Sequence, residues 1–232
     1  MKKHLPNLLT LSNLICGALG IIQVFEGDLE TATYLIWLAA AFDFLDGFVA
    51  RALKVNGELG KQLDSLADMI TFGLLPAFIM FRLLRTYSDS EWLPYIAFAI
   101  AAFSALRLAK FNIDTRQSDS FIGLNTPANT LFISALPFVL TGAPTILGLP
   151  TSTVLLTITV VFSLLLVAEI GFIALKFKDF TWKNNKSKFI LLAGALVLLI
   201  FFRQAALVYI IPFYILMSVA ENLLTKENRE KT

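Results

Sequence analysis

Four aspartates at regular spacing are the residues of this chain best suited to chemistry. Asp43 and Asp46 are three residues apart and Asp64 and Asp68 are four apart, so each pair shares one face of a helix. All four lie in or beside apolar segments, where carboxylates are costly to bury unless something neutralises them. Mg²⁺ and Mn²⁺ prefer oxygen ligands, and Mg²⁺ usually shares its coordination shell between carboxylates and substrate phosphates. The aspartates therefore predict a metal site that works on phosphate.

Small residues and one arginine accompany these carboxylates. Gly47 and Ala50 continue the stripe of the first aspartate pair, while Gly57 and Gly60 flank the turn before the second pair. Faces rich in small residues let two helices approach closely and leave space for a ligand. Arg51 can hold a phosphate oxygen. Two metal ions about 3.5–4 Å apart are a known solution for phosphoryl displacement, and one aspartate would remain to accept a proton from an attacking hydroxyl.

A transporter is the alternative, because paired carboxylates in membrane helices also bind transported ions or protons. Spacing alone supports a phosphoryl-transfer enzyme and a cation-coupled transporter about equally. Transporters place their sites near the bilayer midplane. The arginine, the glycines and the position of the motif at helix ends favour the enzyme.

The elements that must position these residues are membrane helices. The chain has 232 residues, of which 57% are hydrophobic and only 16% charged, against about 25% charged in soluble domains. This composition predicts a single membrane domain over 1–232. The net charge of +2 is too small to indicate a nucleic-acid partner, and one cysteine excludes an internal disulfide.

Hydropathy predicts an all-α, polytopic helical bundle with about eight spans, since a span needs about 20 mostly apolar residues. We expect six core transmembrane helices and a C-terminal pair divided at Arg203. The predicted spans are 8–25, 32–54, 62–85, 92–112, 127–142, 151–175, 188–202 and 204–224.

Charge predicts the orientation of this bundle. With both termini inside, most of the 19 basic residues fall on the inner side, as the positive-inside rule requires. The chain is therefore expected to be N-in and C-in, in the cell membrane, with the aspartates facing the cytoplasm. Residues 176–188 form a predicted basic cytoplasmic linker, and 225–232 form a polar tail.

The motif from Asp43 to Asp68 resembles a known signature. It reads D-x2-D-G-x2-A-R-x8-G-x3-D-x3-D, the pattern of the CDP-alcohol phosphatidyltransferases, and every fixed position matches. The segments PNLLTLSN, DSLADMITFGLLPA, RLAKFN and FIGLNTPAN resemble the phosphatidylserine synthase branch of that family, although Asn125 stands where the branch usually has proline.

This resemblance implies a homodimer with a polar cavity open to the cytoplasm. It implies two divalent ions, Mg²⁺ or Mn²⁺, on Asp43, Asp46, Asp64 and Asp68, with Asp68 as the general base. A hydroxyl would attack the β-phosphorus of CDP-diacylglycerol and release CMP. The residues implied to bind the nucleotide and diphosphate are Asn7, Thr10, Gly47, Ala50, Arg51, Gly57 and Gly60.

The acceptor implied by the branch is L-serine, so that the product is phosphatidylserine. Glycerol 3-phosphate or an inositol derivative is the alternative on the same scaffold. Arg107, Lys110 and Arg116 are the candidate acceptor-binding residues, because they lie at the inner end of the fourth predicted span. Arg107 is the candidate partner of the serine carboxylate.

Overall fold

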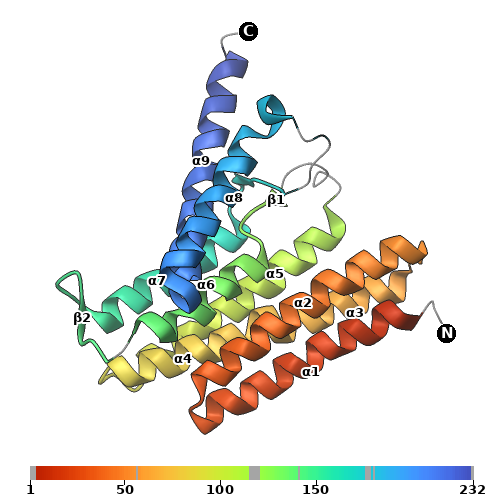
Figure 1. The fold of residues 1–232 in the computed structure, drawn as a ribbon. Helices are drawn as coiled ribbons and strands as arrows, with labels where there is room; N and C mark the ends of the chain where they lie inside the picture. The colour runs from red at the N-terminus through yellow and green to blue at the C-terminus, as the bar shows by residue number, and fades with distance from the viewer. Residues whose placement is uncertain are drawn as a thin grey trace.

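The computed structural model describes residues 4–55, 57–114, 121–140, 142–175, 179 and 181–230 (Figure 1). Within these ranges most residues are helical, and each of the strands has two residues. The elements are α1 (Leu5–Glu26), α2 (Leu29–Leu53), α3 (Glu58–Asp68), the π-helical η2 (Met69–Leu74), α4 (Leu75–Tyr87), the 3-10 helix η3 (Leu93–Ala97), α5 (Phe98–Ile113), β1 (Phe121–Ile122), α6 (Thr126–Val139), β2 (Thr145–Ile146), β3 (Leu149–Pro150), α7 (Thr151–Val167), β4 (Gly171–Phe172), α8 (Trp182–Phe202), the 3-10 turn η4 (Arg203–Ala206) and α9 (Leu207–Glu230).

Helices long and apolar enough to cross a bilayer dominate the described part of the chain. Five segments meet this standard, and they are Leu5–Glu26, Leu29–Leu53, Glu58–Tyr87, Leu93–Ile113 and Asn185–Leu223. The predicted all-α, multi-pass membrane architecture is confirmed at this level. The count of eight spans stays a prediction, because α6 has 14 residues and α7 has 17, both fewer than the roughly 20 that a span needs. The N-in, C-in orientation also stays a prediction.

Packing of α1 shows how these helices expose apolar surface and bury small or polar residues. Its buried residues repeat every three or four positions and include Thr10, Asn13, Gly17 and Gly20. Its exposed face carries large apolar side chains such as Leu8, which is 58% exposed. A Cβ at Gly17 would overlap Thr71, so this glycine allows close approach between α1 and η2. Small residues have this role at helix contacts in membranes.

The prediction of a sixth span over 151–175 is wrong at its C-terminal end. Helix α7 stops at Val167, and the chain then becomes extended and pairs β4 with β1 in an antiparallel register. Backbone N–H groups of the β1–α6 segment cap this end, since Leu124 donates to the Leu165 carbonyl at 2.9 Å and Gly123 donates to the Ile170 carbonyl at 2.9 Å. Hydropathy alone does not detect these long-range backbone bonds.

The C-terminal region forms the expected pair of helices. Helix α8 ends at Phe202, Arg203 adopts a positive φ of 49°, and α9 begins at Leu207. The two helices lie side by side (Figure 1). Helix α8 starts earlier than predicted, so 182–188 of the predicted linker is helical except at Asn185, while 176–178 lie outside the described residues. Helix α9 extends to Glu230, into the predicted tail.

Candidate active site

The motif residues gather where α1 begins, α2 ends and α3 begins. Helix α1 packs against both α2 and α3, and the turn between α2 and α3 lies at the same end as the N-terminus (Figure 1). Lys54 closes α2 in the left-handed conformation, and Gly57 precedes α3 with extended backbone. The turn therefore reverses the chain so that both aspartate pairs face one region.

Three of the four aspartates form a tight cluster. Oxygen atoms of Asp43, Asp64 and Asp68 all lie within 4.8 Å of one another. Two ionised carboxylates at that separation repel by about 3.5 kcal/mol at an effective dielectric constant of about 20. Asp68 is only 9% exposed, so water screens it poorly. Oxygen donors of this number and charge fit a hard divalent cation.

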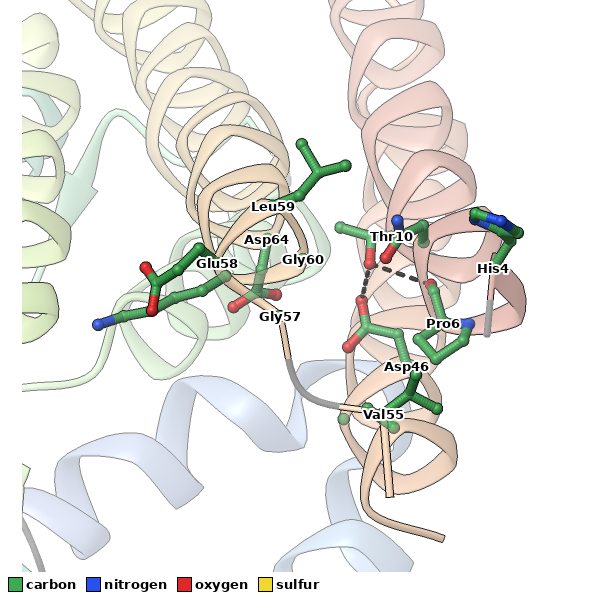
Figure 2. Close-up of a pocket in the computed structure, with 14 residues that line it drawn as sticks. His4, Pro6, Thr10, Asp46, Val55, Gly57, Glu58, Leu59, Gly60 and Asp64 are labelled. Atoms are coloured by element: carbon green, nitrogen blue, oxygen red, sulfur yellow. Dashed lines mark hydrogen bonds between the residues drawn. The ribbon is translucent and has the colours of Figure 1, made fainter. Parts of the chain in front are cut away.

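Asp46, the fourth aspartate, is held by α1. Its Oδ2 accepts a hydrogen bond of 2.5 Å from the Thr10 hydroxyl (Figure 2). The same hydroxyl lies 3.1 Å from the Pro6 carbonyl within the helix. Thr10 was expected at the nucleotide, and its bond to Asp46 was missed by sequence reasoning. Metal binding by Asp46 stays a prediction, since it is not part of the cluster of three.

Asp68, the predicted base, is also contacted by α1. The Asn13 side-chain Nδ2 donates to Asp68 Oδ1 at 3.2 Å, and Asn13 is fully buried. This contact was missed as well. The available signal was a polar residue three positions after Thr10, on the same face of an otherwise apolar helix. Two α1 side chains thus fix one carboxylate from each aspartate pair.

The backbone changes from α-helical to π-helical directly after Asp68. Segment η2 has six residues, and α4 continues from it without a break. The Thr130 hydroxyl donates to the Phe72 carbonyl at 2.6 Å, and the Thr71 hydroxyl donates to the Asn13 carbonyl at 3.1 Å. Single π-helical turns are frequent at functional sites because they reorient neighbouring side chains. The sequence predicts only one continuous span over 62–85.

A cavity of about 760 Å³ lies beside the carboxylates, between the starts of α1 and α3 and the end of α2 (Figure 2). Its volume is in the range of small-molecule sites, about 300–1,000 Å³. Six of the seven predicted nucleotide residues line it: Asn7, Thr10, Gly47, Ala50, Gly57 and Gly60. His4 and Glu58 line it too, without having been predicted. The seventh, Arg51, lies next to this wall, with Nη1 3.3 Å from the position of a Cβ at Gly47.

The predicted acceptor residues lie at a second cavity. Arg107 and Lys110 line this space of about 350 Å³, and Arg116 lies outside the described residues. Arg107 is buried and donates from Nη1 to the Thr126 hydroxyl at 3.2 Å. Its helix, α5, packs against η2, which begins directly after Asp68.

Hydrogen bonds join α3, which lines the larger cavity, to α5, which lines the smaller one. Lys61 Nζ donates to the Asn112 carbonyl at 2.9 Å, and Asn112 Nδ2 donates to the Ser65 hydroxyl at 2.8 Å. Asn112 therefore has a structural contact in this arrangement. Because Lys61 also lines the larger cavity, these bonds join the wall of that cavity to α5, the helix that carries Arg107.

Comparison with known proteins finds several relatives of similar sequence. The chain is similar to CDP-diacylglycerol–serine O-phosphatidyltransferase of Bacillus subtilis, with 32% identity over 58% of this chain and 76% of that protein. It is 37% identical to archaetidylserine synthase of Methanothermobacter thermautotrophicus over 60% of this chain and 58% of the relative. A Helicobacter pylori CDP-diacylglycerol–serine O-phosphatidyltransferase is 35% identical over 55% of this chain and 54% of its own length.

These alignments cover between about half and three quarters of each relative. The family model described as CDP-alcohol phosphatidyltransferase matches residues 3–225, which is nearly the whole chain. It therefore includes both cavities and the aspartate cluster. On this match, and on the motif assembled around the cavity, the chain belongs to the CDP-alcohol phosphatidyltransferase family.

Proposed function

We propose that the chain transfers the phosphatidyl group of CDP-diacylglycerol to the hydroxyl of L-serine, giving phosphatidylserine and CMP in phospholipid biosynthesis. The observation that carries this proposal is the cluster of Asp43, Asp64 and Asp68 beside a cavity lined by six of the predicted nucleotide residues. The names of the relatives supply the acceptor, because each of the three contains serine.

The reaction is an in-line displacement at phosphorus. The serine hydroxyl oxygen forms a bond to the β-phosphorus, the bond from that phosphorus to the CMP oxygen breaks, and the hydroxyl proton passes to Asp68. Asn13 donates to Oδ1 of Asp68 and orients this carboxylate for the transfer. The cytidine and diphosphate lie in the larger cavity, where Gly57 and Gly60 present no side chain, and Arg51 holds a phosphate oxygen.

The four aspartates are the proposed ligands of two divalent ions, Mg²⁺ or Mn²⁺. When bound, such ions neutralise charge on the diphosphate and on the leaving CMP. The Thr10 hydroxyl orients Asp46 toward this role by fixing Oδ2. Gly47 and Ala50 have small side chains or none, so α2 leaves space for a ligand beside that carboxylate.

Arg107, Lys110 and Arg116 are the proposed acceptor-binding residues, with Arg107 bound to the serine carboxylate. A buried guanidinium is suited to this role because its planar donors match a carboxylate in a bidentate pair. The packing of α5, which carries Arg107, against η2 directly after Asp68 supports an acceptor site near the proposed base.

The proposed setting is the cell membrane, with both termini and the active site on the cytoplasmic side. Support comes from the distribution of the basic residues along the sequence. A homodimer is proposed from the family resemblance alone.

The test is CMP release by the purified protein in detergent with CDP-diacylglycerol and Mg²⁺ or Mn²⁺. The panel of acceptors holds L-serine, glycerol 3-phosphate and an inositol derivative, and an ether-linked CDP lipid serves as a second donor. Release with L-serine alone is the expected result. Release only with a phosphorylated acceptor would overturn the assignment of L-serine as the acceptor. Ion flux in liposomes without CMP release would identify a transporter instead.

A further inference from the structure

The smaller cavity carries charges of both signs. Besides Arg107 and Lys110, its lining includes the acidic residues Asp114 and Glu169. A phosphorylated acceptor would bring its negative charge next to these acids, which is unfavourable for binding. An α-amino acid is a zwitterion, with one carboxylate and one ammonium group on the same carbon. The mixed charge of the lining matches that pattern.

Arg107 supplies the positive partner from a fixed position. The side chain is 7% exposed, donates from Nη1 to Thr126 at 3.2 Å, and lies with its guanidinium carbon 5.8 Å from the centre of the Phe111 ring. Among the described residues, its buried Nε has no hydrogen-bond partner. A buried donor without an acceptor is unfavourable. Because Arg107 lines the cavity, a ligand carboxylate bound there can accept from its guanidinium.

Glu169 supplies the negative partner. It lies just after the end of α7, in a segment that is no longer helical. Helix α7 ends at Val167, and backbone bonds from Gly123 and Leu124 fix the segment on both sides of Glu169, at Ile170 and Leu165. Gly123 has a φ of +79°, and a Cβ there would overlap the Leu166 carbonyl. The close contact therefore depends on glycine. The exposed Glu169 side chain is carried on a backbone held at the edge of the cavity.

Two further bonds secure the same segment from α9. Asn222 of α9 donates to the Gly171 carbonyl in β4, and the Ser218 hydroxyl accepts from the Ile173 N–H at 3.2 Å. The extended segment after α7 is thus bonded on one side to the β1 region and on the other to α9. In an uninterrupted helix over 151–175, residue 169 would lie about 200° around the helix axis from residue 167. The hydrogen bonds that anchor this segment would then be absent.

We propose that the smaller cavity binds the acceptor as a zwitterionic α-amino acid, with Glu169 accepting from its ammonium group while Arg107 binds its carboxylate. The inference rests on the proposed function, and it makes Glu169 a specificity-determining residue. Arg107 is on α5, which packs against η2 directly after Asp68, so the third substituent, the hydroxymethyl group, would face the base. Three points of attachment on one carbon select the L enantiomer over the D enantiomer.

The test compares the wild type with Glu169→Gln in CMP release at saturating CDP-diacylglycerol. Removing the charge of Glu169 weakens a charge-assisted hydrogen bond, so we expect the KM for L-serine to rise about tenfold and kcat to change less than twofold. 3-Hydroxypropanoate has the hydroxyl and the carboxylate but no ammonium, so its inhibition constant against L-serine should be the same in both proteins. Glu169→Asp should restore much of the affinity for L-serine.

The controls separate this inference from the proposed function. Glu91→Gln removes an exposed acid from the loop between α4 and η3, and Asp114→Asn removes the other acid of the same cavity. No CMP release by the wild type with L-serine would overturn both proposals. Release with an unchanged KM in Glu169→Gln, an equal rise in the inhibition constant of 3-hydroxypropanoate, or an effect carried by Asp114→Asn instead would overturn the role of Glu169 alone.

Discussion

The bond between Thr10 and Asp46 makes a specific kinetic prediction. At 2.5 Å it lies at the short end of the range for hydroxyl-to-carboxylate bonds, about 2.5–2.7 Å. Thr10→Val removes the hydroxyl and keeps the shape of a side chain that is 3% exposed, so no cavity forms. A hydrogen bond to a charged group contributes about 1.5–3 kcal/mol net. Because each 1.36 kcal/mol is a factor of ten in rate, kcat/KM should fall about 10- to 150-fold.

The assay is initial-rate CMP release over a series of CDP-diacylglycerol and Mn²⁺ concentrations. Because Asp46 is a proposed metal ligand, part of the loss should appear as a higher Mn²⁺ requirement. Thr10→Ser keeps the hydroxyl and should stay within a few-fold of the wild type.

Ser12→Ala is the matched control for Thr10→Val. The Ser12 hydroxyl makes the same bond to the carbonyl four residues earlier, at 2.9 Å to Leu8, but on the exposed face of α1. It should have no kinetic effect. If Thr10→Val retained kcat/KM within twofold of the wild type, or if Ser12→Ala lost as much activity, the orienting role of Thr10 would be refuted.

Three further predictions concern the proposed base, the glycine wall of the larger cavity and the metal ions. The side chain in Asp68→Asn cannot accept a proton, so kcat should fall by about 10²–10⁴ while calorimetry still detects binding of CDP-diacylglycerol. A near-normal rate would show that Asp68 is not the base. Gly60→Ala places a Cβ 3.5 Å from Asn7 Oδ1, an ordinary contact, so the unfolding temperature should be kept while the KM for CDP-diacylglycerol rises. Gly17→Ala, whose Cβ overlaps Thr71, should instead lower the unfolding temperature. Excess EDTA should stop CMP release and added Mg²⁺ or Mn²⁺ should restore it, whereas activity that persists in EDTA would contradict a metal-dependent reaction.

Local periodicity predicted which aspartates share a helix face. The steps of three and four between the aspartates placed them on common helix faces, and the structure brings Asp43, Asp64 and Asp68 together. Gly47, Gly57 and Gly60 were expected at a ligand, and they line the larger cavity. These relations depend on spacing along one or two adjacent helices. The sequence contains that spacing directly.

Contacts between distant segments could not be read in this way. Asn13 meets Asp68 across 55 positions, and Thr130 bonds to the π-helical turn across 58. Each contact depends on how the helices pack and on where a helix departs from regular geometry. Hydropathy predicted one long span over 151–175, since it measures only the apolar character of consecutive residues.

The sequence by itself therefore determined the membrane architecture and the four-aspartate motif with its small-residue faces, because helical periodicity and hydrophobicity are local properties. Only the tertiary structure decided which residues hold those carboxylates and where α7 ends. It also decided that Arg107 and Glu169 line one cavity. Hydrogen bonds between segments far apart in the chain set those positions, and such bonds exist only once the helices have packed.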